Sequence, residues 1–157
     1  MQEMDRRIGF LRLTLADITD RERQAGETTR QLRAQLARVA DATVQFNGSV
    51  TNALAAMSEI EERLAQQETQ LRHLGILRGR AGAELDALLV TRDIATARDR
   101  LAELETERQS ILPDADDASQ RLAEIDAEMR ELRSHIEVAS DAAVRSLAGH
   151  TSDQERA

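Results

Sequence analysis

The sequence predicts an all-α protein built as a long antiparallel coiled-coil helical hairpin, and three observations support this prediction. The 157 residues are 41% hydrophobic, yet only two of them are aromatic and only one is proline. Strong helix formers dominate the chain, and the aromatic residues that strands prefer are scarce. Apolar residues recur with the 3.5-residue spacing of a coiled-coil seam, and a glycine-rich segment interrupts this repeat.

The first predicted arm covers residues 1–74. With Met1 at position a and Met4 at position d, the heptad frame continues without a slip to Leu74. Eighteen of its 22 a and d positions are apolar, where the composition of the chain would give about nine. This repeat indicates a helix that packs one face against a partner helix.

A hairpin tip is predicted at residues 75–82, which read GILRGRAG and contain Gly75, Gly79 and Gly82. Glycine weakens helices and permits the positive φ angles of tight turns. We therefore expect the chain to reverse its direction here.

The second predicted arm covers residues 83–147. Its frame starts with Ala87 at a and Val90 at d, and 16 of its 18 seam positions are apolar. An antiparallel alignment places Leu64 opposite Val90 and gives a hairpin about 100 Å long, and two such hairpins could pair into a four-helix bundle. Residues 148–157 are polar and are expected to form a disordered tail.

Both arms are interrupted at one level of this alignment. Gly48 in the first arm lies near Pro113 in the second, and Arg108 occupies an a position beside them. An internal proline costs about 3 kcal/mol of helix stability and an internal glycine about 1 kcal/mol. These residues mark a tolerated bend, a hinge, or, as an alternative fold, a turn at Pro113 that gives a three-helix bundle.

The composition argues against several chemistries. The chain has no cysteine, so it has no thiolate nucleophile and no cysteine-based zinc site. All 21 basic residues are arginine, which removes lysine-based catalysis and phosphate-loop lysines. The three histidines lack metal-ligand spacing, and a two-helix rod offers no enclosed pocket. We therefore expect no enzymatic activity, no cofactor, no metal and no small-molecule substrate.

The net charge of −8 disfavours binding to nucleic acid or to anionic membranes. Arg72, Arg78 and Arg80 form a local positive spot, but no aromatic stacking residues accompany them. No apolar run approaches the roughly 20 residues of a membrane span, and no leader sequence is evident. The simplest expectation is a cytoplasmic protein or a part of a larger, or virus-like, assembly.

Two groups of residues outside the seam are candidate protein-binding surfaces. The group around the predicted tip combines apolar and arginine side chains: Arg72, Ile76, Leu77, Arg78, Arg80, Leu85, Leu88 and Leu89. These residues cap the hairpin core, become buried in a four-helix dimer, or bind an acidic protein partner. The group at the open end contains Phe10, Leu13, Val144 and Leu147, and it forms a second contact surface or seals that end.

These patterns predict a non-enzymatic structural or interaction protein. It would act as a rod-like spacer or scaffold component that contacts protein partners, or other copies of itself, through its helix faces. The alternative is a regulatory adaptor or chaperone whose hairpin docks or opens onto a partner helix. Even amide protection along the chain would favour the rod, and fast exchange at its middle would favour the adaptor.

Overall fold

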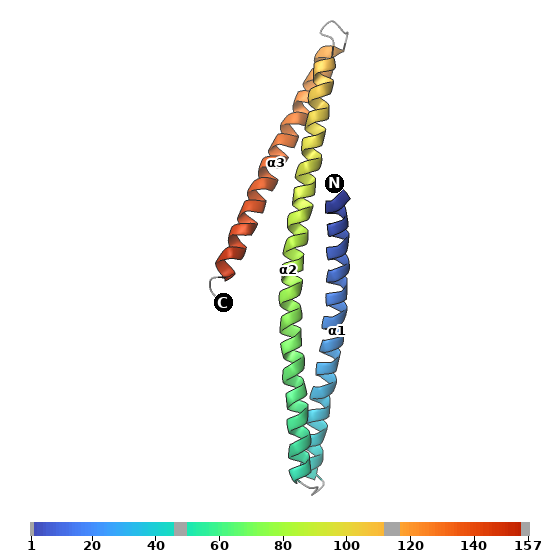
Figure 1. Ribbon diagram of the computed structural model, residues 1–157, viewed down its shortest axis with the longest axis vertical. Helices are drawn as coiled ribbons and strands as arrows, with labels where there is room; N and C mark the ends of the chain where they lie inside the picture. The colour runs from blue at the N-terminus through green and yellow to red at the C-terminus, as the bar shows by residue number, and fades with distance from the viewer. Residues whose placement is uncertain (1, 46–49, 112–116, 155–157) are drawn as a thin grey trace. The chain divides into compact units, whose positions relative to one another are not determined.

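The computed structural model describes residues 2–45, 50–111 and 117–154, and it describes the side chains of 2–42, 50–111 and 117–145. Three helices make up these residues: α1 (Gln2–Gln45), α2 (Val50–Ser110) and α3 (Ala118–Gln154) (Figure 1). No strand occurs in the described part of the chain. The all-α prediction is therefore confirmed.

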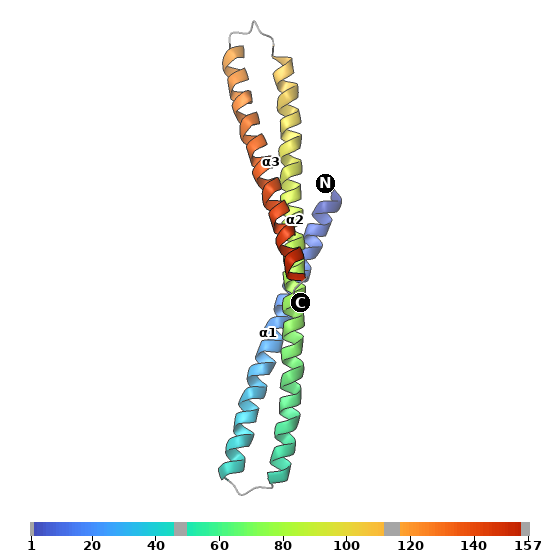
Figure 2. The same cartoon turned by 90° about the vertical axis from the view of Figure 1, so that its left-hand side faces the viewer.

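The chain divides into two compact units, which we call the first and the second hairpin. The first hairpin consists of Gly9–Leu85, and the second consists of Met1–Ile8 together with Asp86–Ala157. In the first, α1 lies beside the first part of α2, and in the second, α3 lies beside the last part of α2 (Figures 1 and 2). Helix α2 therefore contributes one stretch to each hairpin.

In the first hairpin, the predicted heptad stripe lines the interface between the two helices. The buried side chains are Leu11, Ile18, Ala25, Thr29, Leu32 and Leu74, all of which occupy a or d positions of the first frame. Two ion pairs join the helices: Arg33 to Glu68 at 3.0 Å and Arg78 to Glu22 at 2.7 Å. Because the α2 partner moves forward as the α1 residue moves backward, the helices are antiparallel.

In the second hairpin, the core lies between α2 and α3. Leu104 from α2 packs with Ile125 and Met129 from α3, and Leu104 and Ile125 are fully buried. Leu101, Ile111 and Leu132 pack around this cluster. The second predicted frame therefore also identifies the buried face, because all six residues are a or d positions.

The predicted tip at residues 75–82 is wrong, because α2 continues through it without interruption. Gly75, Gly79 and Gly82 lie in helix with no positive φ angle and with open space around each missing Cβ. Each glycine costs about 1 kcal/mol relative to alanine, which the burial of the helix face outweighs. Leu64 and Val90 belong to one helix and cannot face each other, so the division into arms 1–74 and 83–147 is also wrong.

The change of frame between Leu74 and Ala87 has another physical meaning. The second frame is displaced by two residues from the first, and each residue turns an α-helix by about 100°. The apolar stripe therefore moves about 200° around α2 while the helix itself continues. The pattern at residues 75–82 therefore marks a change of helix face and not a change of chain direction.

The chain reverses instead between α1 and α2 and between α2 and α3. Gly48 and Pro113 fall in these two connections and lie outside the described residues. The number of helices agrees with the alternative that placed a turn at Pro113. Helix α3 extends to Gln154, so the expectation of a disordered tail is wrong for residues 148–154, and 155–157 lie outside the described residues.

Candidate protein-interaction surfaces

An open groove of about 350 Å³ runs between α1 and α2 in the first hairpin. Its floor contains Ile18 and Leu74, which are buried, and Leu77, which is 37% exposed. The remaining lining residues are Thr14, Asp17, Arg21, Arg80, Ala81 and Glu84. The groove thus combines a short apolar floor with charged rims, a composition typical of protein contact surfaces rather than of enclosed substrate pockets.

The residues predicted to form a tip lie instead along the side of α2. Arg72, Ile76 and Arg80 are exposed, and Leu77 contributes to the groove. Arg78 is exposed but is held by Glu22 across the hairpin, so it also supports the pairing of α1 with α2. Ile76 and Leu77 are therefore apolar side chains that the first hairpin leaves accessible, and their binding of a partner stays a prediction.

The three leucines of the same group are less accessible. Leu85, Leu88 and Leu89 are half-buried, and they span the boundary between the two hairpins, with Leu85 the last residue of the first. Their half-burial favours a packing role over a fully open surface.

The residues predicted at the open end are divided between the two hairpins. Phe10 and Leu13 belong to the first hairpin and are 67% and 73% exposed on α1. Val144 belongs to the second hairpin and is 65% exposed on α3, while the side chain of Leu147 lies outside the described residues. Phe10 and Leu13, one helical turn apart, form an apolar pair on their own.

Arg108, proposed as a hinge residue, has a pairing role in the second hairpin. Its Nε lies 2.9 Å from Oδ1 of Asp126, and this ion pair joins α2 to α3. It also lines a groove of about 430 Å³ with Asp126, Met129, Arg130 and Arg133. Heptad spacing does not predict this group of arginines, because the group depends on the pairing of α2 with α3. The three-residue spacing of Arg130 and Arg133 was the available signal.

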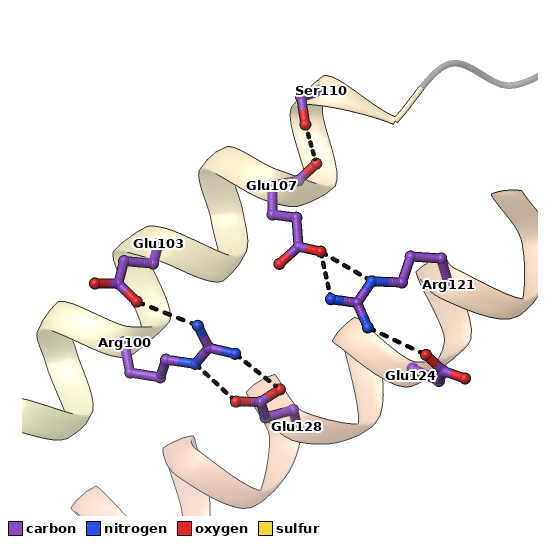
Figure 3. A network of polar contacts seen from close by, with 7 residues as sticks. All are labelled: Arg100, Glu103, Glu107, Ser110, Arg121, Glu124 and Glu128. Carbon is purple, nitrogen blue, oxygen red and sulfur yellow. Dashed lines mark hydrogen bonds and ion pairs between the residues drawn. The ribbon is translucent and has the colours of Figure 1, made fainter.

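A network of ion pairs joins α2 to α3 near the start of α3 (Figure 3). Arg100 donates two hydrogen bonds to Glu128, at 2.8 and 3.4 Å, and a third to Glu103 on its own helix at 3.2 Å. Arg121 on α3 in turn donates to Glu107 on α2, with an Nε to Oε1 distance of 2.8 Å. Two arginines on opposite helices therefore each reach across to a glutamate of the other helix.

The network also shifts the protonation equilibria of its members. The pKa of Glu128 is lowered from its ordinary value, chiefly because Arg100 donates a hydrogen bond to the carboxylate. The pKa of Glu124 is lowered too, first by a hydrogen bond from Gln120 and then by one from Arg121. The pKa of Arg100 is raised, chiefly by its hydrogen bond to Glu128, and the pKa of Arg121 is raised, chiefly by its hydrogen bond to Glu107. Since all four groups stay charged at neutral pH, the network favours one register of α3 on α2.

No group of three or more His, Cys, Asp and Glu side chains is positioned for a metal ion within the described residues. In that same part of the chain, no helix is both long enough and apolar enough to cross a membrane. Comparison with protein-family models, curated proteins and solved structures gives no match.

Proposed function

We propose that the chain is a non-enzymatic structural protein, a spacer or scaffold component whose helix faces contact other proteins or further copies of the chain. The observation that supports this proposal best is the continuity of α2, which spans 61 residues and takes part in both hairpins. An α-helix of this length has a contour of about 90 Å. Helices packed along its two parts provide the tertiary support that an isolated helix lacks.

The accessible apolar side chains support contacts with protein partners. Eight large apolar residues are exposed among the described ones: Phe10, Leu13, Val50, Leu54, Ile76, Leu77, Val138 and Val144. Several occur as pairs on one helix, which makes local apolar patches rather than scattered single residues. Such patches on a protein surface commonly mark sites of association.

The spacer role can be tested by measuring a distance along α2. Because the chain contains no cysteine, Glu62→Cys with Asp99→Cys gives two unique sites for spin labels on exposed positions of the helix. A stiff helix predicts a narrow distance distribution centred at about 55 Å in pulsed electron paramagnetic resonance. A broad distribution, or one centred well below this value, would contradict the spacer role.

A control pair separates stiffness of the whole helix from local order. Glu62→Cys with Arg80→Cys stays inside the first hairpin and predicts a narrow distribution at about 27 Å. If only the control is narrow, α2 is ordered within the first hairpin but does not act as a spacer between the two.

The adaptor or chaperone role is a second candidate, favoured by the glycines of α2. Gly75, Gly79 and Gly82 weaken the helix by about 3 kcal/mol together, and none is required by a neighbouring atom. A helix that is weak there would open locally and release its apolar face to a partner helix. Amide hydrogen exchange distinguishes the two roles, because an adaptor predicts fast exchange at residues 75–82 and a spacer predicts protection there.

A further inference from the structure

We propose that the first hairpin exchanges α1 between two copies of the chain, giving an antiparallel domain-swapped dimer. In this dimer α1 continues directly into α2 as one helix, and the α1 of each copy packs on the α2 of the other. The inference rests on the proposed function, because it identifies a second copy as the protein partner. It also explains a feature of the heptad frame that the hairpin alone does not require.

That feature is the heptad register of α1 compared with that of α2, on the two sides of the chain reversal. The frame passes from Val39 at d in α1 to Ala53 at d in α2 without a slip, although the chain turns between these helices. A hairpin works equally well with any of the seven possible offsets, since each helix rotates independently. A continuous helix needs zero offset to keep its apolar stripe on one face, and zero is the offset observed.

The exposure of Val50 points in the same direction. Val50 occupies an a position and is 59% exposed, whereas every other a or d residue described from Met4 to Leu74 is buried or half-buried. In two continuous antiparallel helices, Val50 lies near the two-fold axis, where the partner helix covers it. The exchange therefore buries Val50, the one exposed residue among the described seam positions from Met4 to Leu74.

The existing contacts transfer to the dimer unchanged. The Arg33–Glu68 and Glu22–Arg78 pairs join α1 to α2, so after the exchange each pair joins one copy to the other. Domain swapping adds few new contacts, because the partner supplies those that the chain makes with itself. What changes is the connection between α1 and α2, whose sequence FNGS contains no proline.

The second hairpin provides a natural contrast. Its frame also keeps phase across the connection, with Ile111 and Ala118 both at d, but Pro113 lies between them. Proline inside a helix removes a hydrogen bond and clashes with the preceding turn. We therefore expect the exchange at the first hairpin and not at the second.

Cross-linking of separately labelled chains tests the exchange. Arg33→Cys and Glu68→Cys are made as single variants of the full chain, mixed in equal amounts, unfolded, refolded together and treated with a short bis-maleimide. Because the two cysteines are on different chains, only an exchanged dimer brings them together, and about half of the dimers will contain one of each. The product is a covalent dimer on a denaturing gel.

The control uses the second hairpin in the same way. Glu105→Cys and Arg133→Cys replace residues that lie 3.5 Å apart across α2 and α3, and this mixture should give no covalent dimer above background. A yield for the Arg33/Glu68 mixture that is no higher than for the control overturns the proposal. That outcome leaves the proposed function intact, since the spin-label distance along α2 tests the spacer role independently.

Two substitutions at one position give a second measurement. Gly48→Ala favours a continuous helix, and since two copies of the residue enter the helices of the dimer, the dimer should bind about thirtyfold more tightly by light scattering. Gly48→Pro should leave the chain at its monomer mass of 17.5 kDa. Equal dimer affinity for both variants, with unchanged helix content, would contradict the exchange.

Discussion

The most direct test of the second hairpin is the removal of its central side chain. Leu104 is fully buried and packs against Ile125 and Met129. Leu104→Ala removes three carbon atoms, worth about 2.4 kcal/mol of lost burial at about 0.8 kcal/mol per carbon, and it leaves a cavity. We expect the free energy of unfolding to fall by about 3 kcal/mol, measured by urea denaturation followed by circular dichroism.

Val138→Ala is the matched control, because Val138 is an exposed apolar residue of α3 in the same hairpin. Its substitution should change the free energy of unfolding by less than about 0.5 kcal/mol. A double-mutant cycle between Leu104→Ala and Ile125→Ala should give a coupling of about 0.5 to 3 kcal/mol. A loss below about 1 kcal/mol for Leu104→Ala, together with zero coupling, would refute the packing of α3 on α2 described above.

Three further predictions concern the helices and their ion pairs. Gly79→Ala should raise the free energy of unfolding by about 1 kcal/mol in urea denaturation, because the added Cβ enters open space inside a helix. Arg78→Ala should lower the free energy of unfolding by no more than about 1 kcal/mol, because the Arg78 side chain is exposed and water screens its ion pair with Glu22. Because the pKa of Glu128 is lowered in the folded chain, its ionised carboxylate stabilises the fold above the ordinary pKa of glutamate, and this stability is lost as the pH falls through the lowered pKa. Arg100→Gln should therefore reduce the difference in the free energy of unfolding between pH 7 and pH 3.

The sequence predicted the buried faces well because heptad spacing reports on burial directly. Residues such as Ile18, Leu32, Leu104 and Ile125 were assigned to the seam by spacing alone, and they are buried. The topology was not predicted, because an a/d stripe specifies that a face is covered but not which helix covers it. Exposed ion pairs cannot decide between alternative alignments either, because each is worth only about 0.2 to 1 kcal/mol.

The candidate surfaces show the same division. Ile76, Phe10 and Leu13 lie outside the seam positions of the first frame, and the structure exposes all three. Whether such residues gather into one surface depends on which helices pair. Of the residues predicted at the open end, Phe10 and Leu13 belong to the first hairpin and Val144 belongs to the second.

Local helix preferences also fail to select between the two topologies. The single long hairpin would place Pro113 and Gly48 inside helices, at a cost of about 4 kcal/mol. The observed topology places Gly75, Gly79 and Gly82 inside α2, at a cost of about 3 kcal/mol, while Gly48 and Pro113 lie outside the described residues. These terms differ by about 1 kcal/mol, less than the burial of a single leucine contributes. The choice of partner helix therefore depends on how well the side chains of each seam fill the space between the helices, which residue spacing alone does not encode.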